Sequence, residues 1–439
     1  MDYTMNEVIQ FIKENDVKFI RLCFCDIFGT LKNISIVADE LPRAFDSGIS
    51  FDASSINGFL NVEESDLFLY PDPTTLSILP WRPQQGRVVR FFCDIKHYDG
   101  TPFEGDCRSI LKKAVETAAK YDYTVEIGSE CEFYLFELDE SGNPTMKPHD
   151  YAAYFDIAPL DKGENVRREI CLTLEQMGII PESSHHEQGP GQNEIDFRYS
   201  DSMSAADNLM TFKSVVKTIA QLNGLHASFM PKPFRNNGGS GLHINISILK
   251  NGINLFDNMQ FNPSKEAESF IAGILNRIRE ITVFLNPLTN SYERFGSHSA
   301  PKYVSWSYQN RSQLVRIPAA SGKYSRMELR SSDPCGNPYL SFALLIYAGL
   351  EGIEKNLKLC EPQNINLYNA EEEILKKYKA IPNTLNNAIE LAEKSEFVRN
   401  HLPNKTLEKY YTAKRDEWNK YIMSDNKEEH EHKSYFYTF

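Results

Sequence analysis

The sequence has little of what would direct a chain to a membrane, to nucleic acid or out of the cell. Its longest apolar run covers only residues 339–350, which is too short to cross a bilayer and instead predicts a buried helix. No basic segment leads into an apolar one at the N-terminus, so we expect no secretion signal. A net charge of -13 argues against nucleic acid or an anionic membrane surface as a partner.

Disulfide and zinc frameworks are also absent from the pattern. The chain has 8 cysteines, and none of them form a Cys-x-x-Cys pair. In a chain of this size, that spacing favours buried reduced thiols, and we therefore expect a cytoplasmic protein. No internal repeat or low-complexity linker is visible. With 439 residues, of which 41% are hydrophobic and 24% charged, the composition is that of an ordinary globular protein with two or more domains.

The texture of the sequence changes near residue 103. Short strand patterns dominate before it, whereas helical patterns alternate with strands from Asp106 onward. This predicts an α+β protein with a small β-rich domain over residues 1–103 and a larger domain over residues 104–439. The polar run at 428–432 is expected to be a solvated tail.

Four predicted strands share one unusual property: one face is apolar and the other carries acids, histidine or arginine. Residues two apart in a strand point to the same face. The polar faces of the strands at 128–136, 193–199, 242–248 and 325–330 carry Glu130 and Glu132; Glu194, Asp196 and Arg198; His243, Asn245 and Ser247; and Arg326, Glu328 and Arg330. Glu187 precedes the second of these strands, on a bend made by Gly189-Pro190-Gly191.

One such strand alone favours a solvated edge strand, but four in one chain indicate a sheet curved around a polar hole. Carboxylates packed together repel one another unless they are protonated or neutralised by cations. The candidate ligands are five carboxylates and one imidazole, and this set suits Mg²⁺ or Mn²⁺ better than Zn²⁺. Two or three such ions would balance the charge of Glu130, Glu132, Glu187, Glu194, His243 and Glu328.

Arginines are concentrated in one later segment, at Arg294, Arg311, Arg316, Arg326 and Arg330. Guanidinium groups bind carboxylates and phosphates in a bidentate manner. Divalent metals combined with arginine are typical of phosphoryl transfer, in which catalysis is mostly positioning and neutralisation of charge. A surface or ion-pair role remains the alternative for any single arginine, and for Arg316 in particular.

These residues resemble the glutamine synthetase family, type I, in its short form without the insertion of the adenylylated subtype. The resemblance covers nearly the whole chain and rests on segments 51–56, 63–66, 100–106, 128–133, 185–187, 191–194, 230–233, 239–243, 290–292, 310–312 and 337–340. It implies a β-grasp-like N-terminal domain and a catalytic domain with a curved, mainly antiparallel sheet, a half-barrel, backed by helices. It also implies a dodecamer of two stacked hexameric rings, with active sites between neighbouring subunits.

The resemblance implies an ATP-dependent ligase that makes glutamine from glutamate and ammonium through γ-glutamyl phosphate. Carried over position by position, one metal is held by Glu132, Glu187 and Glu194 and the other by Glu130, His243 and Glu328. Glutamate is bound by Arg294, Arg330 and Gly239. The phosphates face Arg311, Arg316 and Arg326, with Lys323 and Ser247 on the nucleotide side.

The resemblance also implies an anionic pocket for ammonium. It is formed by Asp52 and Ser55 of a neighbouring subunit together with Tyr154 and Glu187. A carboxylate in such a pocket attracts NH₄⁺, and Asp52 is placed to take its proton. For the N-terminal segment alone, turn formation is the simpler explanation of Asp52 and Ser55.

Two positions depart from the family pattern. The flap at residues 290–301 is one residue shorter than usual, and Ser299 stands where the family has a glutamate that closes the site and accepts a proton. His298 is a candidate replacement base, because its unperturbed pKa lies near neutrality. Gly238 replaces an asparagine of the glutamate site, although Asn237 is one residue away.

Three functions therefore stay open from the sequence. The first is ligation of ammonia to glutamate, and the second is ligation of an organic amine or polyamine, for which the lost flap glutamate would make room. The third is a non-catalytic regulatory relative, against which the complete metal set argues. Tyr368 falls near the modification site of the adenylylated subtype and is expected to be an ordinary surface tyrosine.

Overall fold

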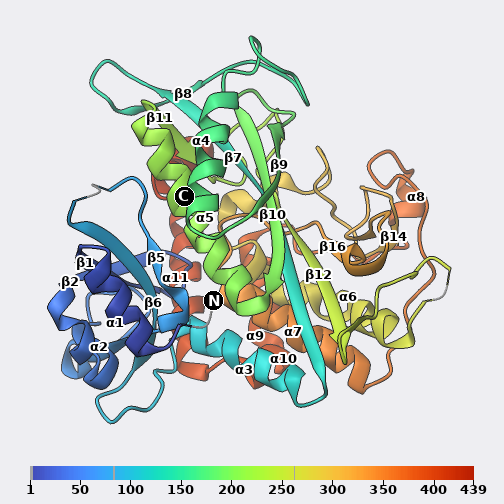
Figure 1. Cartoon of the computed structure of the whole chain (residues 1–439). Helices are drawn as coiled ribbons and strands as arrows, with labels where there is room; N and C mark the ends of the chain where they lie inside the picture. Colours follow the sequence, from blue (N-terminus) through green and yellow to red (C-terminus); the bar gives the residue numbers. More distant parts are fainter. Residues whose placement is uncertain (1–2, 83–84, 262) are drawn as a thin grey trace.

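The computed structural model describes residues 3–82, 85–261 and 263–439 (Figure 1). The first part of the chain forms a sheet in the order β2-β1-β6-β4-β3, with β5 added on β6. β1 and β6 are parallel, and the other neighbours are antiparallel. Its elements are α1 (Met5–Glu14), β1 (Val17–Cys25), β2 (Leu31–Val37), α2 (Leu41–Ser47), β3 (Ile49–Asp52), β4 (Asp66–Pro71), β5 (Ser77–Ile78) and β6 (Arg87–Lys96).

The second sheet runs in the order β14-β15-β16-β12-β7-β10-β9, with β8 and β11 on β7 and β13 on β12. Among the described strands of this second sheet, only the β14–β15 pair is parallel, so the predicted mainly antiparallel sheet is confirmed. The strands are β7 (Tyr123–Leu138), β8 (Pro144–Pro148), β9 (Pro181–His186), β10 (Gln192–Asp201), β11 (Leu225–Ser228), β12 (Leu242–Lys250), β13 (Ile253–Asn254), β14 (Trp306–Tyr308), β15 (Val315–Ile317) and β16 (Met327–Leu329).

Helices cover this sheet and extend to the C-terminal region (Figure 1). Asp106 caps the first of them, as its side chain accepts from the backbone of Arg108. The helices are α3 (Cys107–Ala119), α4 (Glu164–Gln176), α5 (Ser202–Leu222), α6 (Lys265–Leu285), α7 (Pro338–Glu354), α8 (Glu372–Leu375), α9 (Leu385–Lys394), α10 (Glu396–His401), α11 (Asn404–Met423) and α12 (Lys427–Tyr435). The predicted α+β class, with a β-grasp domain followed by a half-barrel sheet, is confirmed.

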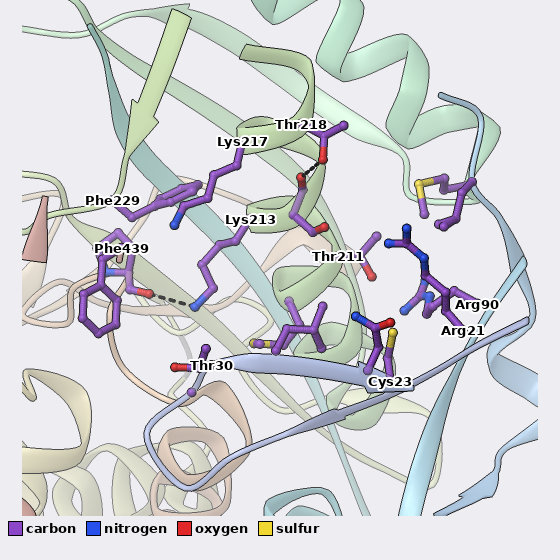
Figure 2. A pocket seen from close by; sticks show the side chains of 18 of the residues that line it. Arg21, Cys23, Thr30, Arg90, Thr211, Lys213, Lys217, Thr218, Phe229 and Phe439 are labelled. Atoms are coloured by element: carbon purple, nitrogen blue, oxygen red, sulfur yellow. Dashed lines mark hydrogen bonds between the residues drawn. The ribbon is translucent and has the colours of Figure 1, made fainter. Parts of the chain in front are cut away.

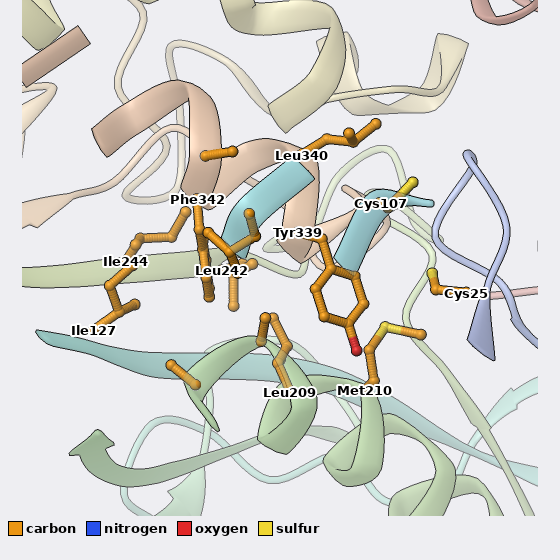
Figure 3. Close-up of a cluster of buried hydrophobic side chains, with 14 of the residues drawn as sticks. Cys25, Cys107, Ile127, Leu209, Met210, Leu242, Ile244, Tyr339, Leu340 and Phe342 are labelled. Carbon is orange, nitrogen blue, oxygen red and sulfur yellow. The ribbon is translucent and has the colours of Figure 1, made fainter. Parts of the chain in front are cut away.

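The core lies between the apolar face of the central strands and helices α5 and α7. Ile127 of β7 and Ile244 of β12 face Leu209 of α5 and Phe342 of α7, and all four side chains are fully buried (Figure 3). The apolar run at 339–350 forms most of α7 and is buried as predicted. In the described parts of the chain, no helix is long and apolar enough to cross a membrane. The alternating strands thus pack their apolar face on this core, and their charged face lies on the opposite side of the sheet.

The C-terminal run differs from the prediction. Residues 428–432 belong to α12 rather than to a solvated tail, and the side chain of Glu431 is only 2% exposed. Glu431 accepts hydrogen bonds from Thr289 Oγ1 and Asn290 Nδ2 at 2.9 and 3.0 Å. The following Phe436 packs in a small cluster with Phe136 and Met230. This polar segment therefore forms a helix that packs on the rest of the protein, through partners that are distant in the sequence.

Candidate active site

The register of the second sheet brings the acidic faces of its strands together. On β7, Glu132 lies opposite Glu194 of β10, and Glu130 lies between Asp196 of β10 and His243 of β12. The row continues outward, because Asn245 of β12 pairs with Glu328 of β16, and Glu328 pairs with Arg316 of β15. Polar residues at two-residue spacing thus build one continuous polar surface across the sheet.

The Gly189-Pro190-Gly191 bend positions Glu187 beside this surface. Gly191 has a φ of +69°, which a residue with a Cβ rarely adopts. A Cβ on Gly189 would lie 2.1 Å from the hydroxyl of Tyr134. The backbone N–H of Glu187 donates to the carbonyl of Gln192 at 2.8 Å, which closes the bend and returns the chain into β10. Both glycines are therefore required by local geometry.

Two overlapping groups of side chains have the geometry of metal ligands. The ligand atoms of Glu130, Glu194 and His243 all lie within 4.8 Å of one another, and so do those of His185, Glu187 and Glu194. His243 Nδ1 also lies 3.0 Å from Glu130 and 3.7 Å from Glu328. Most of the predicted ligands therefore converge, with His185 as an addition that the sequence did not indicate.

The electrostatics of the cluster differ between its two halves. Burial, followed by the charges of Asp196 and Glu132, raises the pKa of Glu194 well above its usual value. Burial and Glu187 likewise raise the pKa of Glu132. At Glu130, burial also acts to raise the pKa, but the hydrogen bonds to His243 and Asn245 outweigh it and lower the pKa to about 2. The half of the site around Glu132 and Glu194 thus has an unmet demand for cations.

Two residues on the polar faces were not assigned a role from the sequence. Asp196 is opposite Glu130, and its pKa is raised to about 6 by burial and by the charge of Glu130. Gln192 donates from Nε2 to Glu132 at 2.8 Å and so orients that carboxylate. The alternation pattern already placed Asp196 on the correct face, whereas Gln192 had no signal because it lies at the start of its strand.

Arginines close the other side of a cavity of about 620 Å³, and Arg311, Arg316, Arg326 and Arg330 all line it. Arg326 donates from Nε to Asn245 Oδ1 at 2.8 Å. Arg316 and Arg330 both pair with Glu328, which is fully buried beneath them. An ion-pair role for Arg316, left open by the sequence, is therefore observed alongside its position in the cavity.

Further predicted residues also line this cavity, namely Glu130, Glu132, Tyr154, Glu187, Glu194, Gly239 and His243. Tyr154 is 40% exposed, and its ring stacks on Phe155 with centroids 4.0 Å apart. Arg294 lies behind the lining: it is 2% exposed and donates to the carbonyls of Ser331 and Ser332. A Cβ on Gly239 would meet the side chain of Arg294 at 2.7 Å, so the two are in close contact.

Six predicted residues are not among those that line the cavity: Arg294 and Glu328, which are buried behind it, and Asp52, Ser55, Ser247 and Lys323. Asp52 and Ser55 lie in the N-terminal domain, where Asp52 accepts hydrogen bonds from Ser54. Ser247 is buried and donates to the carbonyl of Ser325 at 3.0 Å. Lys323 is exposed, with its ammonium 5.0 Å from the ring centroid of Tyr324. Among the described residues, the lining begins at Glu130, so the described part of the N-terminal domain does not line the cavity of its own chain.

The atypical flap reaches the cavity, since both His298 and Ser299 line it. Both have positive φ, at 44° and 64°. The carbonyl of Ser299 accepts from Arg330 at 3.4 Å. Burial, and then the charge of Lys232, lowers the pKa of His298, which keeps the imidazole neutral at pH 7.

The second atypical position is explained by its neighbours. The carbonyl of Gly238 accepts from the Tyr134 hydroxyl at 2.6 Å, and a Cβ on Gly238 would lie 2.9 Å from Gln192 Oε1. Asn237 contributes its carbonyl, which accepts from Lys232 Nζ at 2.5 Å. Tyr368 is half-buried, and its hydroxyl donates to the carbonyl of Arg311 at 3.2 Å.

Comparison with known proteins gives consistent matches along the chain. Residues 16–98 match the family described as "Glutamine synthetase, beta-Grasp domain" and residues 104–435 match "Glutamine synthetase, catalytic domain". The chain is 48% identical over 424 residues to the glutamine synthetase of Clostridium saccharobutylicum, which covers 95% of this chain and 96% of the relative. It is 46% identical over 427 residues to that of Methanosarcina mazei, with 95% of each covered. Among solved structures, a GmaS/ADP complex superposes with a TM-score of 0.87 at 29% identity over 99% of each chain.

Proposed function

The chain belongs to the glutamine synthetase family, and on that premise we propose how its residues carry out the reaction. It is a ligase that forms glutamine from glutamate and ammonia at the expense of ATP. The observation that carries the residue-level proposal is the acidic surface of β7, β10 and β12 facing the arginines across one cavity of about 620 Å³. Acids on one wall and guanidinium groups on the other suit a metal-bound polyphosphate and an amino acid.

The family depends on divalent metals, and the donor set here fits them. Carboxylates and one imidazole are the ligands of hard cations, and burial raises the pKa of Glu132 and Glu194 in the manner of carboxylates that need a cation. We assign two or three Mg²⁺ or Mn²⁺ ions to Glu130, Glu132, Glu187, Glu194, His243 and Glu328. Bound there, the ions supply neutralisation of phosphate charge; Gln192 and Asn245 orient the carboxylates that hold them.

The arginines divide between the two anionic substrates. The phosphates of ATP face Arg311, Arg316 and Arg326. Glutamate is held by Arg294, Arg330 and Gly239. The nucleotide side of the site carries Lys323 and Ser247. The glutamate γ-carboxylate attacks the γ-phosphorus of ATP and displaces ADP, which gives γ-glutamyl phosphate, an intermediate with the good leaving group that a free carboxylate lacks. Ammonia then attacks the γ-carbonyl carbon and displaces phosphate, and the arginines stabilise the negative charge that develops on the departing phosphate.

Ammonium is bound from two subunits in this proposal. Tyr154 and Glu187 line the cavity of their own chain, whereas Asp52 and Ser55 reach it from a neighbouring subunit and Asp52 takes the proton. In this proposal the neighbouring subunit belongs to the same ring of a stacked dodecamer. We also keep the domain boundary at residues 103 and 104, and the 8 free cysteines support a cytoplasmic location.

One assay tests this function against its rivals. Purified protein receives ATP, Mg²⁺ and glutamate with either ammonium or a panel of organic amines and polyamines, and phosphate release and product mass are measured. Glutamine formation with ammonium is the expected result. Turnover with amines alone would instead support the second function, which the missing flap carboxylate favours, and no turnover with any acceptor would support a regulatory relative.

We also propose that His298 acts as the base of the flap. Its neutral imidazole lines the cavity, and the neighbouring Ser299 has no acid–base capacity near pH 7. His298→Ala should lower kcat with ammonium by about 10²-fold or more. His298→Ala combined with Ser299→Glu should recover part of that loss, because a carboxylate then stands in the flap. Full activity of His298→Ala would contradict this role.

A further inference from the structure

A closed loop, residues 231–240, borders the active-site cavity, and we call it the glycine loop. Its base is shut by a hydrogen bond of 2.8 Å from the backbone N–H of Ser240 to the carbonyl of Pro231. Its tip contains Gly238 and Gly239, and both of these glycines line the cavity. The conformation of this short tip therefore decides which backbone groups the cavity offers to a substrate.

The root of the glycine loop is fixed by packing. Phe229 is buried and lies on the wall of a separate cavity together with the C-terminal Phe439 (Figure 2). Met230, the next residue, is fully buried in a cluster with Tyr134 and Phe136 of β7. The ring of Tyr134 thus belongs to the rigid base from which the loop leaves.

Three consecutive carbonyls at the tip of the glycine loop each accept a hydrogen bond from a buried side chain. The donors are Lys232 Nζ to Asn237 at 2.5 Å, the Tyr134 hydroxyl to Gly238 at 2.6 Å and Gln192 Nε2 to Gly239 at 3.2 Å. Because all three donors are buried, the carbonyls of the tip are turned toward the interior of the protein.

The N–H groups of the tip are consequently turned the other way. A trans peptide is planar, so each N–H points away from the carbonyl that precedes it. In residues 3–82, 85–261 and 263–439, the N–H groups of Gly238 and Gly239 have no hydrogen-bond acceptor. Backbone N–H groups away from water are normally paired. The tip therefore presents two adjacent donors to the cavity, and a ligand oxygen would satisfy them.

The Tyr134 hydroxyl is restricted to its bond with the glycine loop. A hydroxyl donates one proton, and the Gly238 carbonyl is closer than Gln192 Oε1, at 2.6 against 3.2 Å. Gln192 Oε1 already accepts from the backbone N–H of Gly189 at 2.8 Å. A Cβ on Gly189 would lie 2.1 Å from the hydroxyl, so the Gly189 backbone packs directly against it. The hydroxyl therefore fixes the orientation of the Gly238 carbonyl.

We propose that Tyr134 is a positioning residue for glutamate: its hydroxyl holds the Gly238 carbonyl so that the N–H groups of Gly238 and Gly239 bind one oxygen of a glutamate carboxylate. This role rests on the ligase function proposed above. Hydrogen bonds from N–H groups to a carboxylate are charge-assisted. Arg294 packs behind the same point, since a Cβ on Gly239 would meet its side chain at 2.7 Å. The two donors take the place of the asparagine amide that is missing at position 238.

Tyr134→Phe removes the hydroxyl and keeps the ring. We expect the KM for glutamate to rise about ten-fold, because one hydrogen bond that orients the tip is lost, while kcat and the KM for ATP change by less than about two-fold. The Kd of glutamate, measured by calorimetric titration with Mg²⁺ and a non-hydrolysable ATP analogue, should rise by the same factor. This Kd depends on neither the acceptor nor turnover, so it separates a failure of the Tyr134 role from a failure of the ligase function.

Tyr410→Phe is the matched control. Tyr410 is also buried, and its hydroxyl donates to the carbonyl of Val283 at 2.9 Å. Both variants should lose a similar amount of stability in urea unfolding, because each loses one buried hydrogen bond to a carbonyl. Only Tyr134→Phe should change the KM and Kd of glutamate. An unchanged Kd of glutamate in Tyr134→Phe, or an equal change in both variants, would overturn the proposal.

Discussion

Glu431 connects the C-terminal helix to the base of the flap, and its removal should affect substrate binding. Its carboxylate bonds to Thr289 and Asn290, which begin the 3₁₀-helix Thr289–Arg294. Asn290 in turn accepts from the backbone N–H of Lys232 at 2.6 Å and donates to its carbonyl at 3.1 Å. One buried carboxylate therefore holds the segment that ends in Arg294.

The cost of Glu431→Ala follows from these contacts. Two hydrogen bonds to a buried carboxylate are lost, each worth about 1.5–3 kcal/mol. Relief of the desolvation that raises the pKa of Glu431 offsets part of this loss. We expect a net destabilisation of about 3 kcal/mol. Glu431→Gln, which keeps the shape but places an amide against donors, should cost about 1–2 kcal/mol.

Urea unfolding and steady-state kinetics together test this reasoning. Glu431→Gln should raise the KM for glutamate more than it lowers kcat, because the displaced segment carries Arg294 rather than the nucleotide site. The matched control is Glu429→Ala on the same helix, where an exposed carboxylate pairs with Asn426 and Lys433, and its loss should cost far less stability than Glu431→Ala. Equal stability and equal KM in the two alanine variants would refute the role of Glu431.

Three further outcomes follow from the geometry. Glu194→Gln should weaken Mn²⁺ binding by more than about ten-fold in a metal titration, yet raise the stability of the metal-free protein, because it removes a charge from a row of acids. Gly189→Ala should destabilise the protein by about 1–3 kcal/mol in chemical denaturation, because its Cβ would overlap the Tyr134 hydroxyl. The pKa of Lys217 is lowered by folding from 10.5 to about 8. Between these pH values the unfolded chain binds more protons than the folded one, so the free energy of unfolding should rise with pH in this range. Lys217→Met should remove that pH dependence and raise the free energy of unfolding at pH 7 by up to about 3 kcal/mol, as measured by urea unfolding at several pH values.

Much of the candidate site was accessible from the sequence because strand alternation has a fixed period. Glu130 with Glu132, and Glu194 with Asp196, could be assigned to polar faces from spacing alone. The order of the strands could not, because pairing between β7, β10 and β12 depends on long-range contacts that no local pattern encodes. The position of Glu194 opposite Glu132 is thus a result of the fold.

The C-terminal run was misjudged for the same reason, because its contacts are distant in the sequence. Glu431 lies 142 residues from Thr289, and a polar segment that docks on so distant a partner is indistinguishable from a solvated one in sequence. The family resemblance supplied the roles of the arginines, which local physical chemistry alone left open.

The two-faced strands also have a consequence for how this protein is made. The proposed metal ligands extend from Glu130 to Glu328, so the acidic surface cannot assemble until most of the catalytic domain has left the ribosome. Until then, β7 must find β10 and β12 through its apolar side, including Ile127 and Cys131, while its acids resist the approach. Because these pairings are distant in sequence, the chain is expected to fold slowly. Divalent cations present during synthesis would reduce the repulsion between these acids as the strands pair, so the metal would assist folding before it takes part in catalysis.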